Sequence, residues 1–410
     1  DGSVTVNADN SGQTVTQGSG SAVPDEAPVI TQRESSVETG NTIAISTSDN
    51  AAANVTIKDI NIKSSNDAID VKGSSSANIT LEGDNKIFSE TGSALHVSDG
   101  NVTINGSGSL KAEIQDEPFG YNHNAKIGSH EKEDMSGSIH ITGDATVKTD
   151  DNIAPNCGGD GAGIGSGEDG EMSGNIVIDG NAQVEVSSND RGAGIGSGDD
   201  GNLSGNIMIG GNAQVSATGA ENSAGIGTGD DGNFTGSITM DGNARVTAKA
   251  GGDHNGSDGS GIGTGDDGDF TGTVTIGGNA AVVAAGSDEG CGIGSSDWKY
   301  MNGIIIIRDH AKVTAYAGNR GAAIGSEDDW DMTGKIIIVG NAIVNTGVVD
   351  DAGNVLSNRI GYIGGGENSN HDSSKGHYIL GSDVTINSLN GSDTEALKQY
   401  VNMHLDSEGN

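Results

Sequence analysis

The chain has 410 residues, a formal net charge of −38 and 70 glycines, while aromatic residues make up only 3% of it. No apolar run is long enough to cross a bilayer, and the excess of acidic residues excludes a protein that binds nucleic acid through a basic stripe. Collagen is excluded as well, because glycine does not recur at every third position.

The beginning of the chain differs from the rest. Residues 1–50 carry no internal repeat and contain two prolines, so we expect them to form an irregular segment that caps the fold. Residues 51–390 are repetitive, and we expect them to form one repeat domain. Its first units are short, since the similar segments at Val55, Ile79 and Val102 are separated by 24 and 23 residues.

Longer units follow, each built around the segment GAGIG or a variant of it. The central isoleucine is followed by an acidic glycine-rich loop, a short alternating strand, a Gly-Asn turn and a second strand. Successive central isoleucines lie 31 to 39 residues apart: Ile127, Ile164, Ile195, Ile226, Ile262, Ile293, Ile324 and Ile363.

Repeats of this length predict an all-β protein, a single-stranded parallel β-helix (solenoid) of about eleven coils. Each strand turns an apolar face inward, and only stacking against neighbouring coils buries that face. A β-propeller fits less well, because its blades need about 40–50 residues each. Stacking also predicts columns of equivalent side chains. We expect an amide ladder from Asn181, Asn212, Asn243, Asn279 and Asn341, and an apolar column from Met135, Met172, Leu203, Phe234, Phe270, Met301 and Met332.

The C-terminal segment has a helical pattern. Ser392 and Glu395 form a capping box, and apolar residues follow at helical spacing. We therefore expect residues 391–410 to form a short helix with a tail, which covers the open edge of the last coil.

The acidic loops are the first candidate site. Coils about 4.8 Å apart would stack carboxylates of like charge, and no Lys or Arg lies in the four loops concerned. Calcium takes six to eight oxygen ligands, so the pattern predicts a ladder of Ca²⁺ ions between coils. Solvated loops with diffuse counterions are the alternative. The expected ligands are Glu168, Asp169, Asp199, Asp200, Asp230, Asp231, Asp266, Asp267 and Asp269.

A second candidate site lies in the equivalent loops nearer the C-terminus, which hold both tryptophans of the chain. Aromatic rings beside carboxylates are typical of sugar-binding surfaces, because rings stack on sugar faces while carboxylates accept hydrogen bonds from hydroxyls. The alternative is that these rings cover the base of the loop. The predicted glycan platform consists of Asp297, Trp298, Tyr300, Asp329, Trp330 and Asp331.

Over about residues 54–365, the units GAGIGSG and GNA, preceded by NVTI, NDAIDV and NITLEGDN, carry a resemblance to a family. They resemble the glycine-rich β-helix regions of large extracellular proteins from Gram-positive anaerobes. That resemblance implies a pectate-lyase-like fold and carbohydrate binding or adhesion. It leads us to expect a secreted or cell-surface bacterial protein that binds a glycan or polysaccharide, or a host surface protein, with no nucleic acid and no membrane span.

An enzyme and a passive structural stalk are the competing functions. The segment Ser65–Val71 resembles an acidic motif of polygalacturonases, but their Asp-Asp, Gly-His-Gly and Arg-x-Lys elements are missing. Repeated loops also give their carboxylates equivalent environments, whereas a polysaccharide lyase or hydrolase needs groups with distinct roles. We therefore favour a non-enzymatic protein.

Histidines and cysteines complete the candidate residues. His123, His130 and His140 fall in one coil and form a possible transition-metal cluster. Cys157 and Cys291 lie four coils apart, too far for a disulfide, so both are expected to be free thiols.

Overall fold

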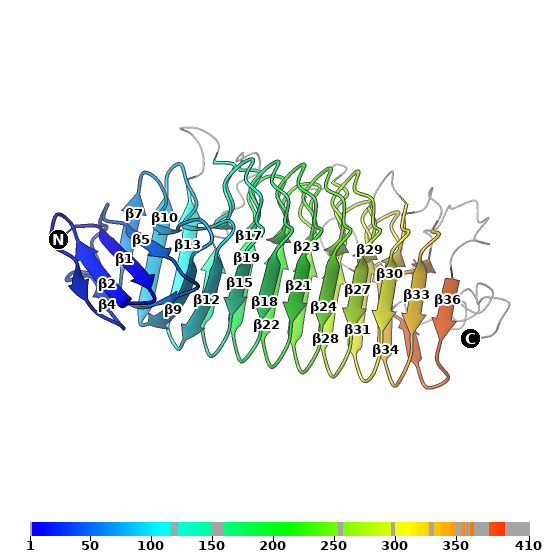
Figure 1. The fold of residues 1–410 in the computed structure, drawn as a ribbon. Coiled ribbons are helices and arrows are strands. Elements are labelled where there is room, and N and C mark those ends of the chain that lie inside the picture. Colours follow the sequence, from blue (N-terminus) through cyan, green and yellow to red (C-terminus); the bar gives the residue numbers. More distant parts are fainter. Residues whose placement is uncertain are drawn as a thin grey trace.

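The computed structural model describes residues 2–115, 122–149, 159–252, 257–296, 300–327, 332–349, 355–356, 359, 361–364 and 377–389. Within these ranges the protein contains strands, turns and loops but no helix. The strands form three long sheets that run the length of a rod, with β1 at one end and β36 at the other (Figure 1). The described part of the chain thus has no long apolar helix of the kind that spans a bilayer.

Sheet 1 has 14 strands, most of which are only two or three residues long in the repeat region. In spatial order they are β3 (Val23–Pro24), β2 (Gly12–Gln17), β1 (Val4–Asp9), β5 (Ile43–Thr47), β8 (Ile69–Val71), β11 (Leu95–Val97), β14 (Ile127–Gly128), β17 (Ile164–Gly165), β20 (Ile195–Gly196), β23 (Ile226–Gly227), β26 (Ile262–Gly263), β29 (Ile293–Gly294), β32 (Ile324–Gly325) and β35 (Ile363–Gly364).

Sheet 2 has 12 strands, one following each acidic loop in the repeat region. They are β36 (His377–Leu380), β33 (Lys335–Ile338), β30 (Ile304–Ile307), β27 (Thr273–Ile276), β24 (Ser237–Met240), β21 (Asn206–Ile209), β18 (Asn175–Ile178), β15 (Ser138–Ile141), β12 (Asn101–Gly106), β9 (Ser76–Glu82), β6 (Ala52–Lys58) and β4 (Val29–Thr31).

Sheet 3 has 11 strands, and each of those from β7 to β34 is followed along the chain by a strand of sheet 1. They are β37 (Thr385–Ser388), β34 (Ile343–Val348), β31 (Lys312–Ala317), β28 (Ala281–Ala285), β25 (Arg245–Lys249), β22 (Gln214–Thr218), β19 (Gln183–Ser187), β16 (Thr146–Thr149), β13 (Ser109–Ile114), β10 (Asp84–Ser89) and β7 (Asn61–Ser64).

The predicted all-β, parallel solenoid architecture is confirmed. Equivalent strands of successive coils pair in parallel, and the central isoleucines stack in register, as Ile164 does with Ile195 and Ile195 with Ile226. The antiparallel strand pairs are β1 with β2 and β2 with β3, within residues 2–24. Strand β1 also pairs in parallel with β5, so the N-terminal segment continues sheet 1.

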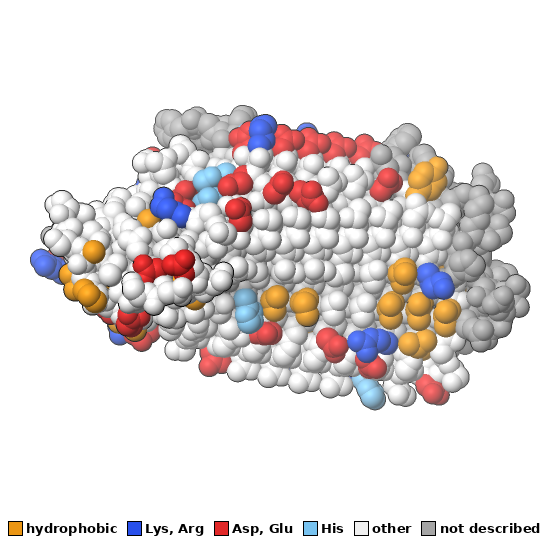
Figure 2. All heavy atoms as spheres, in the orientation of Figure 1, with side chains coloured by type: hydrophobic (Ala, Val, Ile, Leu, Met, Phe, Trp, Pro, Cys, Tyr) orange, Lys and Arg blue, Asp and Glu red, His pale blue; other side chains and the backbone are white. Residues whose placement is uncertain are grey.

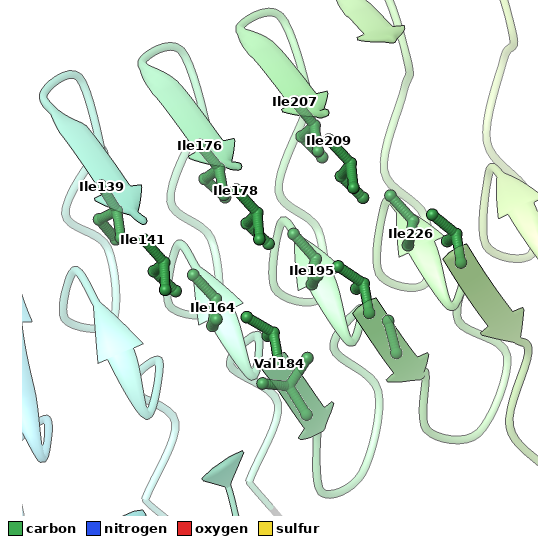
Figure 3. Packing of buried hydrophobic residues seen from close by; sticks show 14 of the residues in the cluster. Ile139, Ile141, Ile164, Ile176, Ile178, Val184, Ile195, Ile207, Ile209 and Ile226 are labelled. Carbon is green, nitrogen blue, oxygen red and sulfur yellow. The ribbon is translucent and has the colours of Figure 1, made fainter. Parts of the chain in front are cut away.

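The core lies between the three sheets. Ile176 and Ile178 of β18, Ile164 of β17 and Val184 of β19 all point into it, and each is at most 3% exposed (Figure 3). The apolar column under the loops is also present, since its members from Met135 to Met301 form bridges between coils and Met332 is buried. Stacking therefore buries apolar side chains that a single coil would leave in water.

One strand pairing differs from the spacing of the similar segments. The spacing of 23 residues would stack Val102 on Ile79, but the structure pairs Ile79 with Ile104 and Val102 with Ala77. The two-residue shift leaves every side chain on its face of the sheet, because side chains alternate with a period of two. At Ile79 and Val102, the similarity of the two segments therefore indicates which side chains face inward, but it does not indicate which residues pair.

The predicted amide ladder forms over four coils. Asn212 donates to Asn181 at 3.0 Å, Asn243 to Asn212 at 3.0 Å and Asn279 to Asn243 at 3.1 Å. Asn341 is separated from it by one coil, in which His310 occupies the equivalent position.

The expected free thiols and the expected C-terminal helix lie only partly within the described residues. Cys291 is a buried free thiol, while Cys157 lies outside the described residues. The C-terminal helix expected within residues 391–410 also lies outside them.

Candidate functional site

The strands of sheet 1 are so short that the loops before and after each strand come together at one edge of the rod. These loops stack in register: the main-chain N–H groups of Asp169, Asp200 and Asp231 each donate, at 2.9 Å, to the carbonyl oxygen of the next acidic loop. Figure 2 shows the resulting row of acidic side chains along the rod. We call this region the acidic edge.

The two acidic residues of each loop form separate columns. The second residues, Asp169, Asp200, Asp231 and Asp267, have φ angles of 51 to 57° and are exposed. We call them the outer column. The first residues are more buried, and Asp199 and Asp230 are only 8% and 6% exposed. This inner column consists of Glu168, Asp199, Asp230 and Asp266. Asp269 lies two residues further on and is half-buried.

A third column faces the inner one, from the loop before each strand of sheet 1. Its members lie four residues before each central isoleucine: His123, Asp160, Arg191, Asn222, Asp258, Glu289 and Arg320. The main-chain N–H groups of Glu168, Asp199 and Asp230 donate to the carbonyl oxygens of His123, Asp160 and Arg191, at 3.0, 2.9 and 3.1 Å. We call it the facing column. Its residue types vary from coil to coil, so similarity between the repeats does not reveal it, although the offset of four residues is constant.

Basic residues do supply part of the counter-charge, contrary to the expectation. They come from outside the acidic loops: Arg191 Nη1 lies 3.7 Å from Asp230 Oδ2, and Lys132 Nζ lies 3.5 Å from Asp169 Oδ2. Burial raises the pKa of Asp230 to about 6, although Asn222 donates to its carboxylate at 3.3 Å. The residues facing each inner carboxylate therefore decide how well its charge is compensated.

Asp199 is the least compensated member of the inner column. Its main-chain N–H donates to the carbonyl oxygen of Asp160, so the residue that faces it is acidic and not basic. Burial raises the pKa of its carboxyl group to about 8, with further contributions from Asp230 and Asp160, and Arg191 opposes the shift. Burial likewise raises the pKa of Glu168; His123 opposes this shift, and Asp160 and Glu131 add to it. The acidic edge therefore attracts protons or cations most strongly near Asp160.

The predicted histidine cluster does not form, because residues of one coil spread around its whole cross-section. His140 Nε2 lies 3.0 Å from Asp179 Oδ1, on sheet 2. His130 stacks on His96 of the preceding coil, with ring centroids 3.9 Å apart and planes inclined by 5°. His123 belongs to the acidic edge.

Three carboxylates surround the His96–His130 pair. His96 Nδ1 lies 3.1 Å from Asp70 and its Nε2 2.8 Å from Glu133, while His130 Nε2 lies 2.7 Å from Asp67. Burial of the His96 ring opposes protonation, but the hydrogen bonds to Asp70 and Glu133 raise its pKa to about 9. His96 is therefore an imidazolium at neutral pH.

A long groove runs across the outer face of sheet 3. It has a volume of about 580 Å³ and is lined by residues of seven successive strands, from β16 to β34. Amide, hydroxyl and basic side chains line it, including Gln183, Gln214, Thr247, Arg245 and Lys312. The groove therefore offers hydrogen-bonding groups at regular intervals along the rod.

Sheet 3 also carries a local excess of basic residues. Its described strands contain only three acidic side chains, Asp84, Glu113 and Glu185. Against these stand seven basic ones: Lys63, Lys86, Lys111, Lys148, Arg245, Lys249 and Lys312. Charge is thus segregated, with basic groups on this face and carboxylates at the acidic edge.

The predicted glycan platform falls mostly outside the described residues. Tyr300 is described and is 42% exposed. Asp297, Trp298, Asp329, Trp330 and Asp331 lie outside the described ranges.

No protein-family model matches this chain, and neither a curated protein nor a solved structure matches it.

Proposed function

We propose that this protein is a non-enzymatic, glycan-binding or adhesive β-solenoid that is secreted by a bacterium or displayed on its surface. The observation that carries this proposal is the groove on sheet 3, which extends over seven successive strands. We further propose a single-stranded β-helix of about eleven coils with capped ends. A host surface protein is the other partner that a long flat sheet can accommodate.

The lining of the groove fits an extended polysaccharide. Parallel strands are about 4.8 Å apart, so Gln183 and Gln214, which are register partners, present amides at this repeat. Such groups bind sugar hydroxyls along a linear chain. Arg245 and Lys312 add positive charge, which favours an acidic polysaccharide despite the net charge of −38.

We propose that Ca²⁺ binds along the acidic edge and stabilises the stacked loops. Two unit charges about 4 Å apart repel by about 1 kcal/mol even in water, and by several times more near a protein surface. The outer column repeats like charges from coil to coil at about the 4.8 Å spacing of parallel strands, and its exposed carboxylates are accessible to a hydrated ion. A hard cation with six to eight oxygen ligands would relieve the repulsion.

The competing enzymatic function finds less support. Glu185 is the only carboxylate that lines the described groove on sheet 3, whereas glycoside hydrolysis uses two. A second hollow, of about 730 Å³, is lined by Asp67, Asp70 and His130. Burial opposes the ionisation of Asp70, but a hydrogen bond from His96 lowers its pKa. A hydrogen bond from Lys132 lowers the pKa of Glu131, which also lines this hollow, so neither group is a protonated general acid at neutral pH.

Titration with neutral and acidic polysaccharides, followed by calorimetry, tests the proposal. Arg245→Ala combined with Gln214→Ala should weaken binding at least tenfold, and Lys335→Ala on sheet 2 should leave it unchanged. Equal binding by all variants would place the glycan elsewhere, for example at the tryptophan platform. If no polysaccharide binds, a passive stalk is the better interpretation, and release of reducing or unsaturated ends would establish an enzyme.

A further inference from the structure

We propose that His123, Asp160 and Glu168 bind one divalent transition-metal ion, such as zinc, at the N-terminal end of the acidic edge. The site lies apart from the glycan groove. It also differs in chemistry from the proposed calcium sites, because one of its donors is an imidazole nitrogen.

The three donor atoms converge on one point from two adjacent coils. His123 Nδ1 lies 2.7 Å from Asp160 Oδ2 and 2.6 Å from Glu168 Oε2, and all three atoms lie within 4.8 Å of one another. Backbone hydrogen bonding fixes this arrangement, since the N–H of Glu168 donates to the carbonyl oxygen of His123. The side chains are 14 to 25% exposed, so an ion can enter from solvent while being largely enclosed.

The donor set favours zinc over calcium. Calcium takes oxygen ligands, whereas an imidazole with two carboxylates suits borderline ions such as Zn²⁺. Zn–N and Zn–O bonds are about 2.0–2.2 Å long, which places the donors of a tetrahedral ion about 3.4 Å apart. His123 Nδ1 and the two carboxylate oxygens therefore need to separate by less than about 1 Å, and Nδ1 must carry no proton when it binds the ion.

Asp199 supplies a second, independent observation. It is 8% exposed, and its carboxylate has no hydrogen-bonding or ion-pairing partner among the described residues. Its main-chain N–H donates to the carbonyl oxygen of Asp160, which places it against the triad from the next coil. A buried carboxylate without a partner is costly, and a cation at the triad would compensate it.

The other histidine group does not provide a comparable site. Asp67, His96 and His130 also bring three ligand atoms within 4.8 Å of one another, but the two imidazole rings stack face to face. The ring nitrogens of His96 instead hydrogen-bond to Asp70 and Glu133 at opposite edges of the ring. The hydrogen bonds made by both His96 ring nitrogens therefore distinguish that group from the His123 triad, in which one imidazole nitrogen lies against two carboxylates.

The test is calorimetric titration of the full, chelator-treated chain with zinc chloride, with Co²⁺ absorption as a second readout. His123→Ala and Asp160→Asn should each lose one equivalent of bound zinc, and His140→Ala, which removes a histidine paired with a single carboxylate, should retain it. Co²⁺ bound to the unmodified protein should give ligand-field bands that disappear in the same two variants.

Two outcomes would overturn the proposal: no zinc binding by the unmodified chain, or unchanged stoichiometry in both His123→Ala and Asp160→Asn. Circular dichroism shows whether each variant is folded, and Asp160→Asn, which is nearly isosteric, decides if His123→Ala unfolds. A parallel Ca²⁺ titration separates the two metal proposals. If the two variants lose zinc binding but still bind calcium, the zinc site is distinct from the proposed calcium sites.

Discussion

The main-chain N–H of Asp199 donates a hydrogen bond to the carbonyl oxygen of Asp160 at 2.9 Å, which holds two acidic residues of adjacent coils together. The neighbouring inner residues Glu168 and Asp230 lie over His123 and Arg191. The solenoid thus places a like-charge pair between two compensated positions. Among the described members of the inner column, the like-charge contact therefore occurs where Asp199 faces Asp160.

This arrangement predicts that Asp199→Asn stabilises the metal-free protein at alkaline pH. The folded-state pKa of Asp199 is about 8, whereas the ordinary pKa of an aspartate is 3.8. Because the folded pKa is raised, the associated stability is fully present below about 3.8 and is lost as the pH rises through 8. Asparagine resembles the protonated acid, so the gain in melting temperature should grow from pH 5 to pH 9. If the gain in melting temperature is the same at both pH values, the pKa of Asp199 is not raised in the folded state.

The imidazolium of His96 predicts a second pH dependence. Its folded-state pKa is about 9 and the ordinary pKa of a histidine is 6.5, so its stabilising contribution is complete below pH 6.5 and lost as the pH rises through 9. His96→Gln should lower the melting temperature at pH 6 and have little effect at pH 10. His310→Gln, at an exposed position, is the matched control. If His96→Gln costs the same stability at both pH values, the ring is neutral.

Calcium should raise the melting temperature of the unmodified protein, and a chelator should reverse the increase. Asp200→Asn with Asp231→Asn removes two neighbouring carboxylates of the outer column, and we expect at least half of the calcium-dependent increase to disappear. The pair Asp49→Asn and Asp84→Asn changes the net charge equally at exposed positions away from the acidic edge. An identical calcium response in both double variants would mean that the outer column binds only diffuse counterions.

Much of the fold could be predicted because the repeat length is nearly constant. Equal spacing of Ile164, Ile195 and Ile226 leaves one way to stack them, and the same spacing places the acidic loops in register. The register at Val102 was harder to predict, since a shift of two residues preserves the inward face and the sequence contains no further constraint.

The candidate site could be predicted only in part, because backbone conformation decides which carboxylates face inward. Asp199 and Asp200 are adjacent and chemically identical, yet the positive φ of Asp200 accompanies an exposed side chain while Asp199 is buried. The facing column escapes detection for another reason. Residues as different as Asp160 and Arg191 occupy equivalent positions in it, so similarity between repeats does not reveal them.

The glycine after each central isoleucine gives the most direct test of close stacking. Gly196 has a φ of +142°, and a Cβ atom built on it would lie 1.8 Å from the carbonyl oxygen of Gly227 in the next coil. Gly196→Ala must therefore force two coils apart, and we expect it to destabilise the protein by about 3 kcal/mol or more, measured by denaturant unfolding. Gly210 is the matched control, because a Cβ there meets no atom within 4 Å. Gly210→Ala should be close to neutral, since the methyl group extends into open space. If both substitutions have similarly small effects, the coils are not stacked as closely as the contact between Gly196 and Gly227 requires.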